Sequence, residues 1–61
     1  MKVILKWKRE TKGAHFYQEV NSDGEELNAA NGAVIQSLYV RKNAMSDPEN
    51  PKQQIEFDLD I

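Results

Sequence analysis

His15 is the only histidine in the chain, and its imidazole is the first side chain that could do chemistry. A histidine serves as a general base when a nucleophile or an orienting carboxylate lies within hydrogen-bond reach. The carboxylate on the same strand face is Glu19, and four residues along a strand separate the two side chains too widely for direct contact. We therefore predict that His15 is a surface or cross-strand histidine without a catalytic role.

The carboxylates of Glu56, Asp58 and Asp60 recur at every second residue, and such a group could suggest a site for a divalent cation. Alternate side chains of one strand lie ~7 Å apart, so the three groups cannot converge on one ion without a bulge or a partner strand. The segment Asp-Gly-Glu-Glu at residues 23–26 resembles a fragment of a calcium loop but lacks the rest of the pattern. The chain has no cysteine, which excludes disulfides and the usual zinc sites. We expect no metal, no cofactor and no catalytic residue.

A third group combines basic and aromatic side chains that could contact a single-stranded nucleic acid. Basic groups bind phosphates, and exposed aromatic rings stack on bases. The net charge of −2 and the pI near 5.2 argue against a dedicated nucleic-acid binder, which is commonly basic. Trp7 alternates in phase with Val3 and Leu5, so we assign it to the core. The candidates for nucleic-acid contact are Lys6, Lys8, Arg9, Lys12, Tyr39, Arg41 and Lys42.

The end of the chain predicts a strand with one apolar and one acidic face. From Ile55 to Ile61, apolar and acidic residues alternate without interruption. Because successive side chains of a strand point to opposite faces, Ile55, Phe57, Leu59 and Ile61 share one face and the acids share the other. This one-sided pattern is typical of an antiparallel sheet.

The strand-like runs cover residues 2–9, 14–20, 33–42 and 53–61. Thr-Lys-Gly at 11–13 suits a short hairpin connection, and Asn-Ser-Asp-Gly at 21–24 suits a tight turn. We expect a loop or a single helical turn at 25–32 and an exposed loop at 43–52, which contains both prolines. The sequence thus predicts one all-β domain over residues 1–61, a small antiparallel four-stranded meander or open barrel.

Alternation in the second and third runs assigns side chains to two faces. In the second run we assign Phe16 and Val20 to the core face and His15 to the opposite face. In the third run both faces carry apolar residues, and Ile35 and Tyr39 share the face away from the core, which is typical of a strand covered partly on both sides. The predicted core consists of Val3, Leu5, Trp7, Phe16, Val20, Leu38, Val40, Ile55, Phe57 and Leu59.

Opposite charges predict that the first and last strands are neighbours. Residues 1–12 carry five basic groups and one acid, whereas the last strand carries three acids and no base. Lys2, Lys6 and Lys8 are expected on one face of the first strand. Cross-strand pairs of opposite charge stabilise a sheet by ~0.2–1 kcal/mol each. We expect the two strands to pair, either within one chain or between chains.

The small size of the chain predicts a partner. A domain below ~70–80 residues seldom draws more than ~3–5 kcal/mol from its core and usually needs a disulfide, a metal or another chain. Because the sequence offers neither a disulfide nor a metal site, we expect a homo-oligomer, and a dimer is the commonest closed form. The alternative is a marginally stable monomer. The apolar residues expected to form the protein interface are Ile4, Ile35 and Tyr39.

A nine-residue stretch at 36–44, Gln-Ser-Leu-Tyr-Val-Arg-Lys-Asn-Ala, precedes a proline-containing loop and the alternating last strand. Together with Thr-Lys-Gly at 11–13 and the strand at 17–20, it resembles a group of very short, mostly uncharacterised bacterial and phage-associated proteins. The resemblance implies a small β fold of microbial or viral origin. It implies no established activity and no site residues.

These observations favour a non-enzymatic β module that works through self-association and protein contacts, in an accessory, inhibitory or structural role. The alternative is a β protein that binds single-stranded nucleic acid through Lys6, Lys8, Arg9, Tyr39 and Arg41. No run approaches the ~20 apolar residues of a membrane span, and the basic residues among the first eight are unlike a signal peptide. We therefore expect a cytoplasmic protein without membrane contact.

Overall fold

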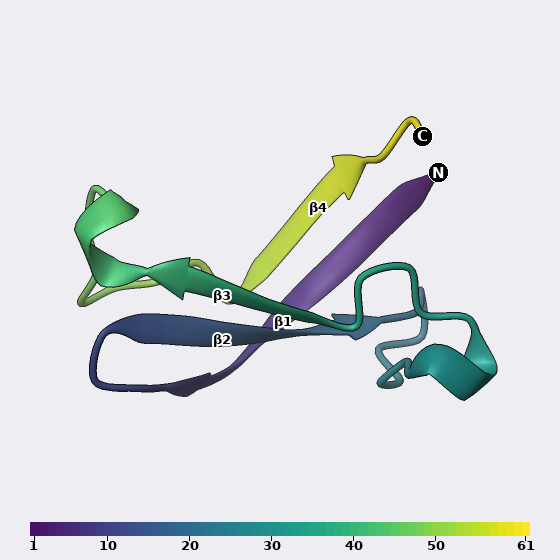
Figure 1. Cartoon of the computed structure of the whole chain (residues 1–61), viewed down its shortest axis with the longest axis horizontal. Helices are drawn as coiled ribbons and strands as arrows, with labels where there is room; N and C mark the ends of the chain where they lie inside the picture. Colours follow the sequence, from purple (N-terminus) through teal and green to yellow (C-terminus); the bar gives the residue numbers. More distant parts are fainter.

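The computed structural model describes all 61 residues and contains one antiparallel sheet. Its strands are β1 (Lys2–Glu10), β2 (Ala14–Val20), β3 (Ser37–Arg41) and β4 (Gln54–Asp58), and the single-turn 3-10 helices η1 (Ala29–Asn31) and η2 (Lys42–Ala44) lie in the long connections. The order across the sheet is β3-β2-β1-β4. The chain forms a meander from β1 to β3, and the last connection brings β4 to the other side of β1 (Figure 1). The predicted all-β antiparallel fold is confirmed.

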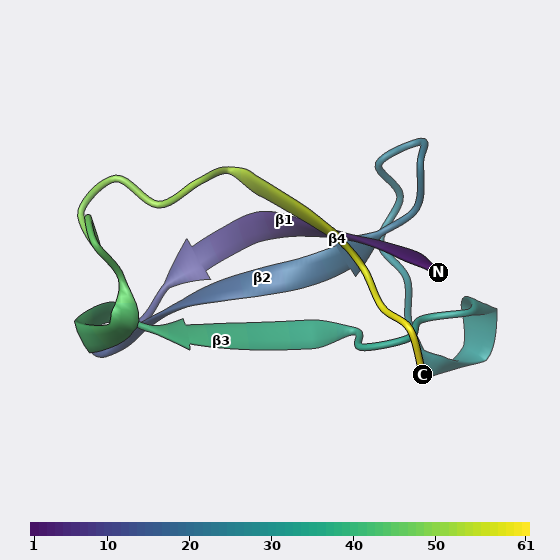
Figure 2. The same ribbon diagram turned by 90° about the horizontal axis from the view of Figure 1, so that it is seen from above.

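The sheet is curled into a half-barrel. β1 and β4 run obliquely to β2 and β3 (Figure 1), and β3 and β4 are the two edges (Figure 2). The two ends of the chain lie close together, because the amino group of Met1 donates a hydrogen bond to the carbonyl of Leu59 at 2.8 Å. Neither η1 nor η2 has the length or the apolar content that a membrane-spanning helix needs.

The predicted pairing of the first and last strands is confirmed, and it occurs within one chain. β1 and β4 are antiparallel neighbours with Val3 opposite Phe57. The Lys2 ammonium lies 2.9 Å from the Glu56 carboxylate on the same face. The hydrogen bond from Lys2 lowers the pKa of Glu56 and raises that of Lys2. Both side chains are exposed, so the pair orients the strands more than it stabilises them.

The centre of the core consists of Val3, Leu5 and Tyr17, which are almost completely shielded from solvent. We call the side of the sheet that carries them the inner face, and the opposite side the outer face. The partly buried residues packed against this centre are Trp7, Ile35, Leu38, Val40, Ile55, Phe57 and Leu59. Eight of the ten predicted core residues therefore belong to the inner face, and Phe16 and Val20 do not.

The predicted orientation of β2 was wrong. Leu5 pairs with Glu19 and Trp7 pairs with Tyr17, and cross-strand partners share a face. The odd-numbered residues of β2 consequently lie on the inner face, and Phe16 lies on the outer face. Phe16 and Val20 are nevertheless buried as predicted, at 8 % and 5 % exposed, and side chains of β1 and β3 cover Phe16. An apolar, buried side chain of this sheet therefore need not lie on the inner face.

A bulge in β1 changes the direction of one basic side chain. Trp7 pairs with Tyr17 and Arg9 pairs with Phe16, which leaves Lys8 as an extra residue. Arg9 thereby joins the outer face beside Phe16. The Lys8 ammonium reaches the Glu26 carboxylate at 3.2 Å.

The third strand is shorter than predicted and begins at Ser37. Gln36 has φ 71°, the only positive φ outside glycine. This left-handed conformation interrupts the alternation of side chains. Ile35 consequently packs against the inner face, whereas Tyr39 lies on the outer face. The prediction that Ile35 and Tyr39 share one face was wrong.

Candidate functional site

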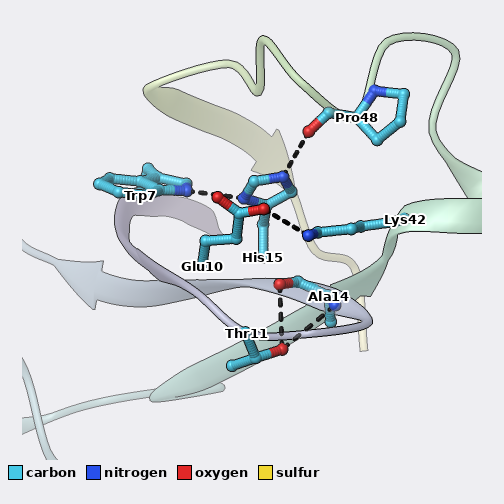
Figure 3. A network of polar contacts seen from close by, with 7 residues as sticks. All are labelled: Trp7, Glu10, Thr11, Ala14, His15, Lys42 and Pro48. Atoms are coloured by element: carbon cyan, nitrogen blue, oxygen red, sulfur yellow. Dashed lines mark hydrogen bonds and ion pairs between the residues drawn. The ribbon is translucent and has the colours of Figure 1, made fainter.

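The inner face contains a buried histidine that connects two strands to a loop (Figure 3). Trp7 Nε1 donates a hydrogen bond to His15 Nδ1 at 3.0 Å, and His15 Nε2 lies 2.6 Å from the carbonyl oxygen of Pro48. Because an indole nitrogen only donates, Nδ1 is the acceptor, and the N–H at Nε2 donates the hydrogen bond to the carbonyl oxygen of Pro48. His15 is 2 % exposed, so the expected surface position was wrong, although its cross-strand contact with Trp7 agrees with the prediction. Both ring nitrogens serve the fold.

An ion pair joins the end of β1 to η2 beside this histidine (Figure 3). The Lys42 ammonium donates to the Glu10 carboxylate, and this hydrogen bond lowers the pKa of Glu10. In the β1–β2 connection, the Thr11 hydroxyl donates to the carbonyl of Ala14 at 3.0 Å and accepts from its N–H at 3.1 Å. These contacts hold the turn and the start of the proline-containing loop together.

A second buried polar group, Glu19, organises the segment before β3. Its carboxylate accepts hydrogen bonds from the backbone N–H groups of Val34, Ile35 and Gln36 at 2.7 to 2.9 Å. Burial alone would raise the pKa of Glu19, but the three backbone hydrogen bonds outweigh it and hold the pKa below its ordinary value. On the same face the Tyr17 hydroxyl donates to the carbonyl of Lys52 at 2.7 Å, and burial raises its pKa.

Sequence reasoning missed Glu19 and Tyr17 as inward residues. The hairpin connection gives no signal for them, because it sets Glu10 opposite His15, and that register without the bulge at Lys8 would put Leu5 opposite Val20. The apolar character of Phe16 and Val20 points to the same wrong face. The partners of Glu19 and Tyr17 come from distant segments, which strand periodicity does not reveal.

The outer face carries a row of three stacked side chains from three adjacent strands. The Arg9 guanidinium lies 4.5 Å from the centre of the Phe16 ring, and Phe16 meets Tyr39 edge to face at 4.8 Å between ring centres. Tyr39 is 55 % exposed, so its ring is the accessible member of the row. Beside it is a hollow of about 380 Å³ lined by Thr11, Gly13, Ala14, Tyr39 and Arg41.

The basic residues predicted to bind nucleic acid divide into two groups. Lys8 and Lys42 are paired with Glu26 and Glu10. The others form no ion pair: Lys6, Arg9, Lys12 and Arg41. Arg9 and Arg41 both lie on the outer face, Arg9 across Phe16 from Tyr39 and Arg41 two residues after Tyr39 along β3, and Lys6 lies further along β1. The structure thus brings together part of the predicted set.

The three predicted interface residues do not form one patch. Ile4 lies on the outer face opposite Val20 and Glu56, and it is half-buried. Ile35 belongs to the inner face, and Tyr39 lies at the outer side of the edge strand β3. Of the three, Tyr39 is the most accessible to a partner.

Both edge strands leave backbone groups without partners. The N–H of Glu19 bonds to the carbonyl of Gln36 and the N–H of Lys42 to that of Gly13, so the even-numbered residues of β3 face β2. The backbone groups of Tyr39 and Arg41 consequently point to the free edge.

In β4 the odd-numbered residues, and not the even-numbered ones, bond to the neighbouring strand. The carbonyl of Gln53 and the N–H of Leu59 bond to β1, so Glu56 and Asp58 present their backbone groups to the free edge. Between the edges and the loop after η2 lies a cavity of about 390 Å³, lined in part by Tyr17, Val40 and Ile55.

The acidic residues do not assemble into a metal-binding group. No three side chains of His, Cys, Asp or Glu lie close enough to hold an ion. In the Asp-Gly-Glu-Glu segment, the Asn21 side chain instead accepts hydrogen bonds from the N–H groups of Asp23 and Glu25, both at 2.9 Å. This arrangement is a side-chain-stabilised turn.

Comparison of the chain with protein-family models, curated proteins and solved structures finds no match. The resemblance of residues 36–44 to short bacterial and phage-associated proteins stays a prediction. The candidate site is therefore defined by geometry alone, as the outer face around Tyr39 together with the free edge of β3.

Proposed function

We propose that the protein is a non-enzymatic β module that works through self-association and protein contacts, in an accessory, inhibitory or structural role in a bacterium or phage. The observation that carries this proposal is an open half-barrel with two unpaired edges, β3 and β4. Exposed ladder groups are templates for pairing with another chain.

The thin core supports the same function. Three side chains form its centre, and seven apolar side chains around them are only partly buried. A second chain that covered the edges or the opening would remove more of this apolar surface from water, at ~25 cal/mol per Å². Association would thereby add to the stability of a small domain that has neither disulfide nor metal.

Sedimentation equilibrium tests the proposal directly. We expect a mass twice the 7.0 kDa of one chain, and a urea midpoint that rises with protein concentration, because folding and association are then linked. A mass of 7.0 kDa that does not change on tenfold concentration, with a constant urea midpoint, would refute self-association.

A second candidate function is binding of single-stranded nucleic acid. The outer-face row supports it, since Tyr39 is accessible for stacking and two cations without an ion pair share its face, Arg41 on the same strand and Arg9 beyond Phe16. Phe16 is too buried to stack on a base, which leaves one accessible ring. Binding would therefore be weaker than on a platform with several exposed aromatic residues.

An oligonucleotide shift assay at two salt concentrations tests this candidate. Binding must weaken steeply with salt, and Arg41→Ala should reduce the slope of log K against log salt by ~0.7. Lys52→Ala is the matched control, because Lys52 is an exposed cation of the loop after η2 and lies away from Tyr39. Equal effects of the two variants, or no binding at low salt, would reject the candidate.

A further inference from the structure

We infer that the partner is a second copy of this chain and that the two copies pair antiparallel through the free edges of β3, with their Tyr39 residues opposite each other on the two-fold axis. This inference rests on the proposed self-association and specifies its interface. The two half-barrels would then share one continuous eight-stranded sheet, and each copy would keep its β4 edge free.

Charge distinguishes the two edges. The residues of β4 whose backbone groups point to the free edge include Glu56 and Asp58. Antiparallel pairing of two β4 edges would therefore place carboxylates opposite or diagonal to carboxylates. Like charges in these positions oppose pairing, and charged side chains are a common protection of edge strands. The corresponding residues of β3 are Ser37, Tyr39 and Arg41, with one charge among them. β3 is therefore the edge open to a second copy (Figure 2).

The alternation of backbone groups restricts the register. The backbone groups that point to the free edge of β3 are the N–H and C=O of Tyr39 and Arg41 and the C=O of Ser37. The Ser37 N–H is already bonded to the carbonyl of Ile35. With a two-fold axis at Tyr39, the N–H of each Tyr39 donates a hydrogen bond to the carbonyl of the other Tyr39. Each Arg41 N–H then reaches the carbonyl of the second copy's Ser37. All five residues of β3 then overlap, and the two Arg41 side chains lie at opposite ends of the interface.

This register continues the outer-face row across the dimer. Within one copy, Arg9 lies opposite Phe16 and Phe16 lies opposite Tyr39. Pairing at Tyr39 adds the same three residues of the second copy in reverse order. Tyr39, more than half exposed in one chain, then gains an aromatic cross-strand partner on its open side.

Head-to-tail pairing of β3 with the second copy's β4 is the main competitor, because it would bring Arg41 near Glu56. That contact is heterologous and leaves a free β3 and a free β4 at its ends, so it continues into larger rings or filaments. Pairing of two β3 edges uses the same surface on both copies, so the assembly is complete as a dimer. The two arrangements therefore differ in mass and in the residues that meet.

Cysteine cross-linking decides between them, since the natural chain has no cysteine. Hydrogen-bonded antiparallel partners have Cα atoms ~5.5 Å apart, within the ~4.4–6.8 Å range of disulfides. We expect Tyr39→Cys to form a disulfide dimer on mild oxidation. A mixture of Ser37→Cys and Arg41→Cys, which both keep Tyr39, should give the mixed dimer in preference to either self-linked dimer. Glu56→Cys, at the matched outward position of β4, should stay monomeric on a non-reducing gel.

A second measurement avoids new thiols. Arg41 has φ −67° and ψ 137°, which proline adopts without strain, and its N–H faces the free edge. Arg41→Pro should therefore keep the fold by circular dichroism but sediment as a monomer, whereas Arg41→Ala keeps the N–H and should remain a dimer.

The outcomes separate the inference from the function on which it rests. A dimeric parent in which Glu56→Cys links to Arg41→Cys, or in which Arg41→Pro stays dimeric, would overturn the β3 interface and leave self-association intact. A parent that is monomeric at every concentration would remove both.

Discussion

Glu19 Oε1 accepts a hydrogen bond from the backbone N–H of Gln36 at 2.8 Å, and Gln36 is the one non-glycine residue with a left-handed backbone. The two features belong together. The positive φ ends the extended run before β3, and the carboxylate accepts hydrogen bonds from the backbone N–H groups of Val34, Ile35 and Gln36. A single buried carboxylate thus holds the segment that leads into β3.

Glu19→Gln should destabilise the fold by ~2–3 kcal/mol, because hydrogen bonds to a charged group contribute ~1.5–3 kcal/mol each and an amide cannot replace them all. Urea unfolding measures the change. Glu49→Gln serves as the control, since Glu49 is exposed and forms no ion pair. An equal urea midpoint for both variants would contradict the role of Glu19.

Stability should decrease as the pH falls below about 5, because the pKa of Glu19 is lower in the folded protein than in the unfolded chain. Between the two pKa values the unfolded chain binds more protons, so acid favours unfolding. The exposed Glu10 and Glu56 also have lowered pKa values and act in the same direction. Urea titrations at several acidic pH values should show a flatter dependence for Glu19→Gln. Parallel curves for parent and variant would assign the acid sensitivity to other groups.

His15→Ala should destabilise the protein by ~1–3 kcal/mol, because it leaves the partly buried Trp7 N–H and Pro48 carbonyl without their hydrogen-bond partner. Fluorescence of Trp7, the only tryptophan, reports unfolding, and hydrogen exchange reports opening of the loop around Pro48. His15→Gln is the matched control, since its amide can accept from Trp7 and donate to Pro48. Unchanged stability of His15→Ala would show that the imidazole does not hold the loop.

Gly32→Ala should destabilise the protein by ~1–2 kcal/mol, because Gly32 has φ 103°, which alanine adopts only with strain. Nothing lies within 4 Å of the added carbon, so the cost is conformational and not steric. Gly13→Ala is the control: its surroundings are equally open and its φ is not positive. Thermal melting should separate the two variants, and a Gly32→Ala protein as stable as Gly13→Ala would show that the left-handed turn carries no strain.

Local patterns predicted much of the fold. The bounds of β2 are those expected, Ala14–Val20, and the alternation after Gln54 correctly placed Ile55, Phe57 and Leu59 against the core. It was wrong for Ile61, which is exposed because β4 ends at Asp58. The opposite charges of the first and last strands correctly predicted the β1–β4 pairing. These features depend on residues that are neighbours in the sequence or on the charge of one strand, and both can be read directly from the sequence.

The four strands, their turns and the apolar faces of β1 and β4 are thus encoded in local sequence patterns. Contacts between distant segments decide that Tyr17 and Glu19 face inward, and that Ile35 and Tyr39 lie on opposite faces. Burying a polar group is favourable only when a hydrogen-bond partner is available inside the fold. Those partners lie far along the chain, at Lys52 and at residues 34–36, and the bulge at Lys8 turns Arg9 to the outer face. Periodicity is a local property of the chain, so it contains neither the distant partners nor the bulge.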